Sequence, residues 1–517
     1  MKKVAAKKQI SQETFDECVR ENMEEFDMDL AEATQDAVQQ FESQQVDLSN
    51  IIKHMRAANG DAGGDAQHEN ILDQIKRIIK ELRATTEKMK GTAYNNEDEQ
   101  PVVTNLTQLQ ALCDEVPEAA VVAGRNNAID ILLDLIDGAA SSTCKSTSVL
   151  ETVSAILATL CTDNSDNQDF VGQSGMARLA AVLNAPSTTE SNVSAVARVL
   201  ALVKTACAKH EANKTHFTNA QGVDALFAHF EKATQDESLS KQLALVLRVL
   251  TVNDDPNATF SQAQETIKQL VAKDVIPYIL EIVRGNHDKP EMLSVWLVVL
   301  KQLAITEDNC KKIYELEGLE LLQQVMIQHE KHLVVMMRCI TVLRNVAAAD
   351  ELKAYIIKSG GVERVLTGMR LHLDDPSLQQ HACATLAAIA LRAPENSLRI
   401  VDLGGARQIA FAMRTHRENT ALLRQASLAI RNMVARCVEL RPRILDEDIE
   451  PLLRDAQRYR GCGDEAYAAL RDLGCDIQLS SFGSVATTAQ FNPVNIASNQ
   501  LLESVDEAAE APFAGQR

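Results

Sequence analysis

The chain has 517 residues, too many for one ordinary hydrophobic core, so we expect several domains or an array of repeats. Hydrophobic residues make up 45% of the chain but aromatic residues only 4%, so the interior has to be built from aliphatic side chains, as stacked helices allow. The net charge of −20 argues against nucleic acid or an anionic membrane as the main partner.

The cysteines indicate a reducing compartment. Eleven occur without a CxxC pair, and most lie in apolar runs, such as those around Cys339, Cys383 and Cys437. Residues 1–15 are basic but lack the apolar core of a secretory signal, and no run approaches the roughly eighteen apolar residues of a membrane span. We therefore expect a soluble cytoplasmic protein, with the nucleus as a second location.

Residues 1–55 form an acidic segment. Between residues 11 and 50, twelve Asp and Glu stand against the single Arg20, a net charge of −11. Apolar residues recur at helical spacing in Phe15, Val19, Met23 and Phe26, and again from Leu30 to Phe41, which predicts two short helices. Residues 56–104 are expected to be a flexible linker that contains one helix, His68–Lys90.

From about residue 105 to residue 478 a helical pattern repeats. A glycine stands before a long helix at five places, Gly175, Gly222, Gly318, Gly361 and Gly405, and the last two intervals are 43 and 44 residues. A second set of anchors is spaced by 43, 43, 44 and 40 residues: Leu300, Leu343, Leu386, Ile430 and Leu470. An all-helical period in the low forties is typical of armadillo and HEAT repeats.

Each unit contains a short helix, a glycine turn, a second helix such as Val362–Leu371 and a longer third helix such as Ser377–Leu391. Three helices with a turn glycine, which would supply a positive φ, favour armadillo over the two-helix HEAT unit. We expect about eight or nine repeats over residues 105–478, with an insertion at 253–274 that forms an exposed helix or loop. Residues 479–517 have no periodicity and are expected to be a disordered tail.

Four stretches outside the generic repeat pattern occur in the order of one known family. They are ETFDECVRENMEEF (13–26), AVQQFESQQVDLSNI (37–51), CAKHEAN (207–213) and ALRDLGCD (469–476). Together with the repeats, they make residues 10–478 resemble the armadillo repeat-containing protein six family. The resemblance implies an all-α fold, a right-handed α-solenoid of armadillo repeats behind a short acidic helical segment, with no established enzymatic activity.

Stacked repeats of this kind bury their apolar faces against one another and leave a concave groove lined by the third helices. In peptide-binding armadillo repeats, an Asn on this helix holds the ligand backbone, because a carboxamide carries both donors and an acceptor. That position holds Asn345 and Asn432, and elsewhere Gln302, Ala388, Val249 and Asp472. The position before it is basic at Arg248, Lys301, Arg344, Arg431 and Arg471.

These residues predict a peptide-binding groove with an acidic extended partner. The alternative is that they are solvated positions beside an apolar stripe. The nuclear import receptors of the superfamily place a Trp four residues before the Asn, where this chain has Thr341 and Leu428. Trp296 is out of register and the leading segment is acidic rather than basic, so transport of basic nuclear signals is not expected.

Candidate chemical motifs are weak. His329 and His332 lack the HExxH spacing, and His210 and His216 are six residues apart, on opposite sides of a helix. Cys462 lies between two glycines and could be an exposed thiol. We expect helix-end histidines, structural glycine turns, and no catalytic, cofactor or metal site.

The predicted function is a non-enzymatic scaffold or adaptor, acting as a monomer, that binds an extended protein segment without nucleic acid or membrane. The alternative is a transport receptor or a folding co-factor for a client protein. A further hypothesis is that acidic residues 11–50 dock on the groove or the first repeats and compete with the ligand. Otherwise this segment caps the solenoid or recruits a partner by itself.

Overall fold

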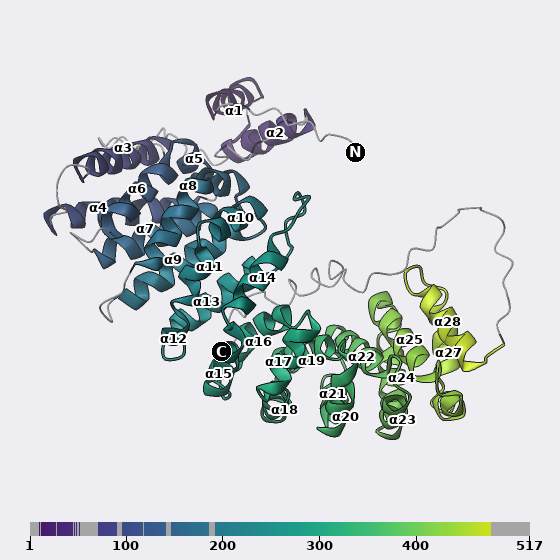
Figure 1. Cartoon of the computed structure of the whole chain (residues 1–517). Helices are drawn as coiled ribbons and strands as arrows, with labels where there is room; N and C mark the ends of the chain where they lie inside the picture. Colours follow the sequence, from purple (N-terminus) through teal and green to yellow (C-terminus); the bar gives the residue numbers. More distant parts are fainter. Residues whose placement is uncertain are drawn as a thin grey trace. The chain divides into compact units, whose positions relative to one another are not determined.

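The computed structural model describes residues 10, 12–26, 28–44, 46, 48, 51, 71–89, 96–116, 118–140, 146–185 and 192–476 (Figure 1). Every secondary-structure element in these ranges is a helix. The described residues fall into two compact units: those up to Leu250 with Asp254–Thr266, and Thr251–Asn253 with those from Ile267 onward. The predicted tail at 479–517 and the linker stretch 56–70 lie outside the described residues.

The acidic segment is a helical hairpin with a small core of its own. The two predicted helices are present as α1 (Gln12–Phe26) and α2 (Leu30–Ser43), and the structure shows that they pack against each other. Their core is a cluster closed by residues that follow α2: Phe15, Val19, Ala33, Ala37, Val46, Leu48 and Ile51. Met23 and Phe26 were expected on the same apolar face, but they are 37% and 64% exposed because the hairpin core ends before them.

The first unit continues with a helix pair and then three three-helix repeats. The pair is α3 (Ile71–Met89) and α4 (Asn96–Glu115). The repeats comprise α5 (Ala119–Arg125), α6 (Ala128–Ala140) and α7 (Thr147–Cys161); α8 (Ser165–Asn184) and α9 (Asn192–Cys207); α10 (Glu211–Asn219), α11 (Gly222–Phe227), α12 (Phe230–Ala233) and α13 (Glu237–Leu250). Helix α8 supplies both a first and a second helix, because the chain bends at Gly172. Since α3 packs on α4, α5 and α6, the packed body begins inside the range expected to be linker.

The second unit holds five further repeats, and its first helix, α14, spans the boundary between the units. They comprise α14 (Ala263–Ala272), α15 (Val275–Gly285) and α16 (Pro290–Leu303); α17 (Glu307–Glu315), α18 (Gly318–Gln328) and α19 (Leu333–Val346); α20 (Asp350–Lys358), α21 (Gly361–Leu371) and α22 (Pro376–Ala390); α23 (Pro394–Asp402), α24 (Gly405–Thr415) and α25 (Thr420–Val434); and the 3-10 turn η1 (Val438–Leu440) with α26 (Arg441–Leu445), α27 (Ile449–Ala456) and α28 (Gly463–Leu473). The five predicted anchors are buried on the third helices of these repeats. Third helices α16, α19, α22, α25 and α28 pack in series (Figure 1).

One left-handed residue precedes the second helix of every repeat in the described part of the chain. The eight residues are Asn127, Gly172, Gln221, Asp274, Glu317, Gly360, Gly404 and Asp448. A single positive φ at this point reverses the chain between the first and second helices. The predicted sharp turn is therefore present, although only three of the residues that make it are glycines.

The glycines that revealed the period have a different role from the predicted one. Gly222, Gly318, Gly361 and Gly405 are the first residues of second helices, and none of them has a positive φ. A Cβ atom on Gly405 would lie 2.4 Å from Ile400 Cγ2 and 2.9 Å from the Ile400 carbonyl oxygen. The prediction that these glycines supply the left-handed turn is wrong, because their requirement is close approach to the first helix.

Histidines near the ends of second helices connect consecutive repeats. In the second unit, the Nε2 atoms of His329, His372 and His416 donate to the carbonyl oxygens of His287, Glu330 and Leu373, at 2.6, 2.9 and 2.8 Å. In the first unit, His229 Nε2 donates to the Leu183 carbonyl oxygen at 2.9 Å. His329 and His332 lie at helix ends, as expected, and the Nδ1 of His332 accepts from the Val335 N–H.

Replacing Gly405 with Ala should destabilise the repeat of α23–α25 by about 2 kcal/mol, because the new methyl group overpacks against Ile400. The matched change is Gly285→Ala at the end of α15, where no atom lies within 4 Å of the added Cβ. Hydrogen exchange of α23 and α24 should accelerate in the first variant only. Equal exchange in the two variants would refute the close-approach argument.

Acidification should weaken the first unit through His229. Burial lowers the pKa of His229, with the nearby Lys232 charge adding to the effect. The contribution of neutral His229 is complete above its unfolded pKa of about 6.5 and is lost as the pH falls through the lowered folded value. His229→Gln keeps an N–H donor that does not titrate. Between about pH 7 and pH 5, the unfolding temperature of this variant should therefore fall less than that of the native chain. His216→Gln is the control, and an unchanged pH response of His229→Gln would contradict the assignment.

Candidate protein-binding surface

Pairs of adjacent residues near the C-terminal end of the third helices form the candidate surface, and all of them are half-buried except Arg471, which is exposed. In α13, Arg248 and Val249 are partly exposed, whereas Leu247 and Leu250 on either side are buried. Because third helices pack in series, equivalent pairs from successive repeats of one unit lie on one face. We call these pairs the third-helix row: Lys204–Thr205 and Arg248–Val249 in the first unit; Lys301–Gln302, Arg344–Asn345, Arg431–Asn432 and Arg471–Asp472 in the second.

The eight residues predicted from the sequence therefore occupy equivalent positions in their repeats. Lys204 and Thr205 were missed, although the alternation of buried and partly exposed residues on α9 matches that on α13. The similar sequences ALVKT on α9 and LVLRV on α13 could have identified this pair. The glycine spacing did not align the two helices, because α9 follows the bent helix α8.

The two asparagines of the row also connect neighbouring third helices. Asn345 Nδ2 donates to the Lys301 carbonyl oxygen at 2.9 Å, and Asn432 Nδ2 donates to the Ala387 carbonyl oxygen at 2.9 Å. The sequence did not predict this structural role. Neither side-chain oxygen accepts a hydrogen bond within the described ranges, so one N–H and the Oδ1 of each carboxamide are left to bind a ligand.

Charge along the row of the second unit varies between repeats. Lys301, Arg344 and Arg431 lie on α16, α19 and α25. Helix α22, which packs between α19 and α25, has Ala387 and Ala388 at the equivalent positions. On α28, Asp472 lies 3.4 Å from Arg431 and 2.8 Å from Arg471. The row is thus basic at α16 and α19, has no charge at α22, and is partly neutralised at α25 and α28, where Asp472 pairs with Arg431 and Arg471.

The weak chemical motifs of the sequence have structural explanations. Cys462 is fully buried and its Sγ contacts the Ala456 carbonyl oxygen at 3.3 Å, so it is not the exposed thiol that its flanking glycines allowed. Burial raises the pKa of Cys383 to about 12, and Cys339, Cys383 and Cys437 are all buried, as predicted. His210 caps α10, and its Nε2 lies 3.0 Å from Asp169 Oδ1.

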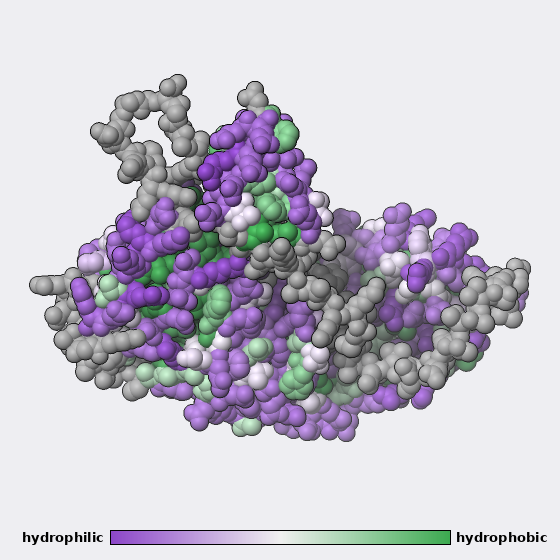
Figure 2. All heavy atoms as spheres, turned by 90° about the horizontal axis from the view of Figure 1, so that it is seen from above, coloured by the Kyte–Doolittle hydropathy of each residue, from purple (hydrophilic) through white to green (hydrophobic). Residues whose placement is uncertain are grey.

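The described residues also bear on metals and membranes. Among them, no group of three or more His, Cys, Asp or Glu side chains is arranged to hold a metal ion. Within the same ranges, no helix has the length and apolar character needed to cross a membrane. On the face that Figure 2 shows, hydrophilic side chains predominate and apolar ones form small patches.

Comparison with known proteins identifies relatives over most of the chain. The ARMC6 family model matches residues 78–487, and the Armadillo repeat-containing protein 6 N-terminal domain matches residues 7–68. Armadillo repeat-containing protein 6 of Homo sapiens is 30% identical over 396 residues, 75% of each chain. The Drosophila melanogaster homolog is 28% identical over 386 residues, which are 74% of this chain and 78% of the homolog.

Solved structures show the same fold at low sequence identity. An engineered protein matches with a TM-score of 0.57 at 17% identity, covering 78% of this chain and 99% of its own. A chain from a study of a phosphorylation switch that controls the interaction between cadherin and beta-catenin matches with a TM-score of 0.54 at 17% identity. The match covers 75% of this chain and 68% of that chain. Both support an all-α solenoid of armadillo repeats.

Replacing Asn432 with Ala should lower the stability of the α22–α25 pair by about 1 kcal/mol, because the Ala387 carbonyl oxygen loses its donor. Arg431→Ala should change stability by less than about 0.5 kcal/mol, because its ion pair with Asp472 is partly exposed. Thermal unfolding of the two variants tests this difference. If Arg431→Ala costs as much as Asn432→Ala, the inter-repeat role of the carboxamide is wrong.

Proposed function

The chain belongs to the armadillo repeat-containing protein 6 family, and we propose that it is a non-enzymatic scaffold in which the third-helix row of each unit binds an extended protein segment. The observation that carries the proposal is the alignment of six row pairs at equivalent positions of their repeats. A solenoid offers such a face to a ligand that is itself extended and has a repeating backbone.

The chemistry of the row favours an acidic partner. Basic side chains occupy the first position of each row pair, and Asn345 and Asn432 place carboxamides at the second position in α19 and α25. The Gln302 oxygen of α16 already accepts from Thr251 Oγ1 at 2.9 Å. Arg and Lys bind carboxylates by charge-assisted hydrogen bonds, while a carboxamide oxygen accepts from a peptide N–H. An extended segment with carboxylates spaced along it satisfies both groups.

The transport and folding alternatives receive less support. A receptor for basic cargo needs an acidic binding face, whereas the row is basic at α16 and α19. We propose a monomeric adaptor in the cytoplasm, with the nucleus as a second location.

A quantitative pull-down from cell extract, analysed by mass spectrometry, tests the proposal. The row bait carries Arg344→Glu and Arg431→Glu, and the control bait carries the same charge change at Arg370 and Arg417, which lie near the ends of α21 and α24, off the row. The asparagines are left unchanged because they connect repeats. Circular dichroism verifies that each bait keeps its helices.

A small set of partners should fall by about tenfold on the row bait and stay on the control bait, because charge reversal opposes an acidic segment. If both charge-reversed baits retain the same partners as the native chain, the row is only a solvated face and the proposal fails.

A further inference from the structure

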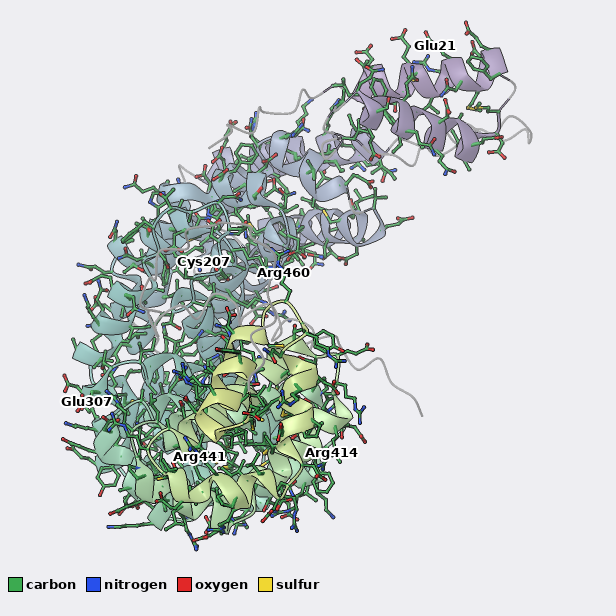
Figure 3. The ribbon with its side chains drawn as sticks, turned by 90° about the vertical axis from the view of Figure 1, so that its right-hand side faces the viewer. Glu21, Cys207, Glu307, Arg414, Arg441 and Arg460 are labelled. Atoms are coloured by element: carbon green, nitrogen blue, oxygen red, sulfur yellow. The ribbon has the colours of Figure 1, made fainter. Side chains whose placement is uncertain are left out.

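The segment CAKHEAN, Cys207–Asn213, and the Lys214 that follows it contact the loop between α13 and α14. This loop is the first part of the insertion expected at 253–274; most of the rest of that range is α14, the first helix of a repeat, so the predicted insertion was too long. Cys207 lies inside the packed helices of the first unit, as Figure 3 shows. The segment then forms the start of α10, with His210 as its N-cap. The sequence marked this segment and the insertion separately, and the structure brings them together.

A buried cation makes the main contact between them. The Lys214 side chain is 0% exposed, and its Nζ is ion-paired with Asp254 of the insertion. Glu211 Oε2 lies 3.7 Å from the same Nζ. A charge that is out of contact with water needs such partners, so removing the insertion carboxylate would leave a costly buried ammonium group.

Backbone contacts fix both ends of the insertion to α10. The Glu211 N–H donates to Asp255 Oδ2 at 2.9 Å, and the Lys209 N–H donates to Asp254 Oδ2 at 3.4 Å. At the other end, the Gln262 N–H donates to Glu211 Oε1. Residues 255–261 therefore form a loop with a defined conformation between two anchored ends.

This loop presents an aromatic side chain to solvent. Phe260 is 68% exposed, the highest value among the exposed large apolar residues of the described ranges. Its exposed neighbours Pro256, Asn257 and Thr259 carry no charge. An aromatic residue on a loop that is already ordered loses little conformational entropy on binding, which is the property of an interaction anchor.

We propose that residues 256–261 are a docking loop on which Phe260 contacts a large apolar side chain of an extended segment bound to the third-helix row of the first unit, at Lys204 and Arg248. This inference rests on the proposed function and adds that the ligand carries a large apolar residue in addition to its acidic residues. The two surfaces are continuous in the chain, because the loop follows α13 a few residues after Arg248 and Val249. The seven residue steps from Val249 to Pro256 span at most about 25 Å when extended, so a segment of about 16 residues that contacts the α13 pair is long enough to reach the loop.

The probe is a phage-displayed library of random peptides, about 16 residues long, selected on the full chain. Sixteen extended residues span about 50 Å, enough to follow several repeats. Affinities of the selected peptides are then measured by fluorescence anisotropy for three variants, Phe260→Ser, Phe170→Ser and Arg248→Glu. Phe170 is the matched control, a Phe of the same unit that is 48% exposed on α8.

Selected peptides should carry acidic residues and one large apolar residue, and Phe260→Ser should weaken their binding about tenfold. Phe170→Ser should change binding less than about twofold. Equal losses for the two phenylalanine variants, or no loss for Phe260→Ser, overturn the docking loop.

Arg248→Glu separates this inference from the proposed function. If Arg248→Glu weakens binding and Phe260→Ser does not, the row stands and the docking loop is wrong. If only Phe260→Ser weakens binding, the loop is a docking site and the row is not. If no selected peptide binds more tightly than about 0.1 mM, both proposals are overturned.

Asp254→Ala tests the loop's anchoring without touching Phe260. It should accelerate hydrogen exchange of residues 255–261 and weaken the selected peptides as Phe260→Ser does, whereas the control Glu231→Ala on α12 should do neither. Unchanged exchange in Asp254→Ala would show that the ion pair does not order the loop, and the inference would lose its basis.

Discussion

The contact between the end of each first helix and the first residue of the next helix determines how a repeat is built. A left-handed residue reverses the chain, and the next residue then lies against the first helix, where Gly222, Gly318, Gly361 and Gly405 leave no room for a Cβ. This contact sets the direction of the second helix, and the third helix packs on the two. In these four repeats a Cβ on the glycine would lie 2.5–2.9 Å from a carbonyl oxygen of the first helix, so the position of the second helix, and with it that of the third, depends on this close approach.

The same contact explains which repeats the sequence revealed. Where a glycine begins the second helix, the period was visible and the helix bounds were nearly correct, as for α21 and α22. Ala128, Val275 and Ile449 begin the second helices of three other repeats, so the glycine signal is absent there. The start of the packed body at α3 was missed because a single amphipathic helix, without a repeat partner in the sequence, cannot be distinguished from a helix within a linker.

For the candidate surface, the sequence identified most positions but not all of their contacts. Helical spacing was enough to place Arg344, Asn345, Arg431 and Asn432 on one face. The partner of Asn432 is a backbone carbonyl 45 residues away, and every residue type offers that acceptor, so no sequence pattern reports it. The burial of Cys462 was missed for a related reason, because its flanking glycines predict a turn but not what covers the turn. The row asparagines therefore connect neighbouring third helices, a structural role that the sequence pattern did not indicate.

The buried Lys214 has a consequence for how this protein can change over time. A surface loop can ordinarily be shortened at little thermodynamic cost. Here, deletion of the insertion would remove Asp254 and leave an ammonium group inside the first unit, with Glu211 as its remaining acidic partner among the contacts above. Deleting the insertion while keeping Lys214, or replacing Lys214 while keeping the insertion, would each be unfavourable. An ancestor without the insertion should therefore also lack Lys214. The segment around residue 210 and the insertion some forty residues later thus behave as a single heritable trait, and a relative that has lost the loop should carry an uncharged residue in place of Lys214.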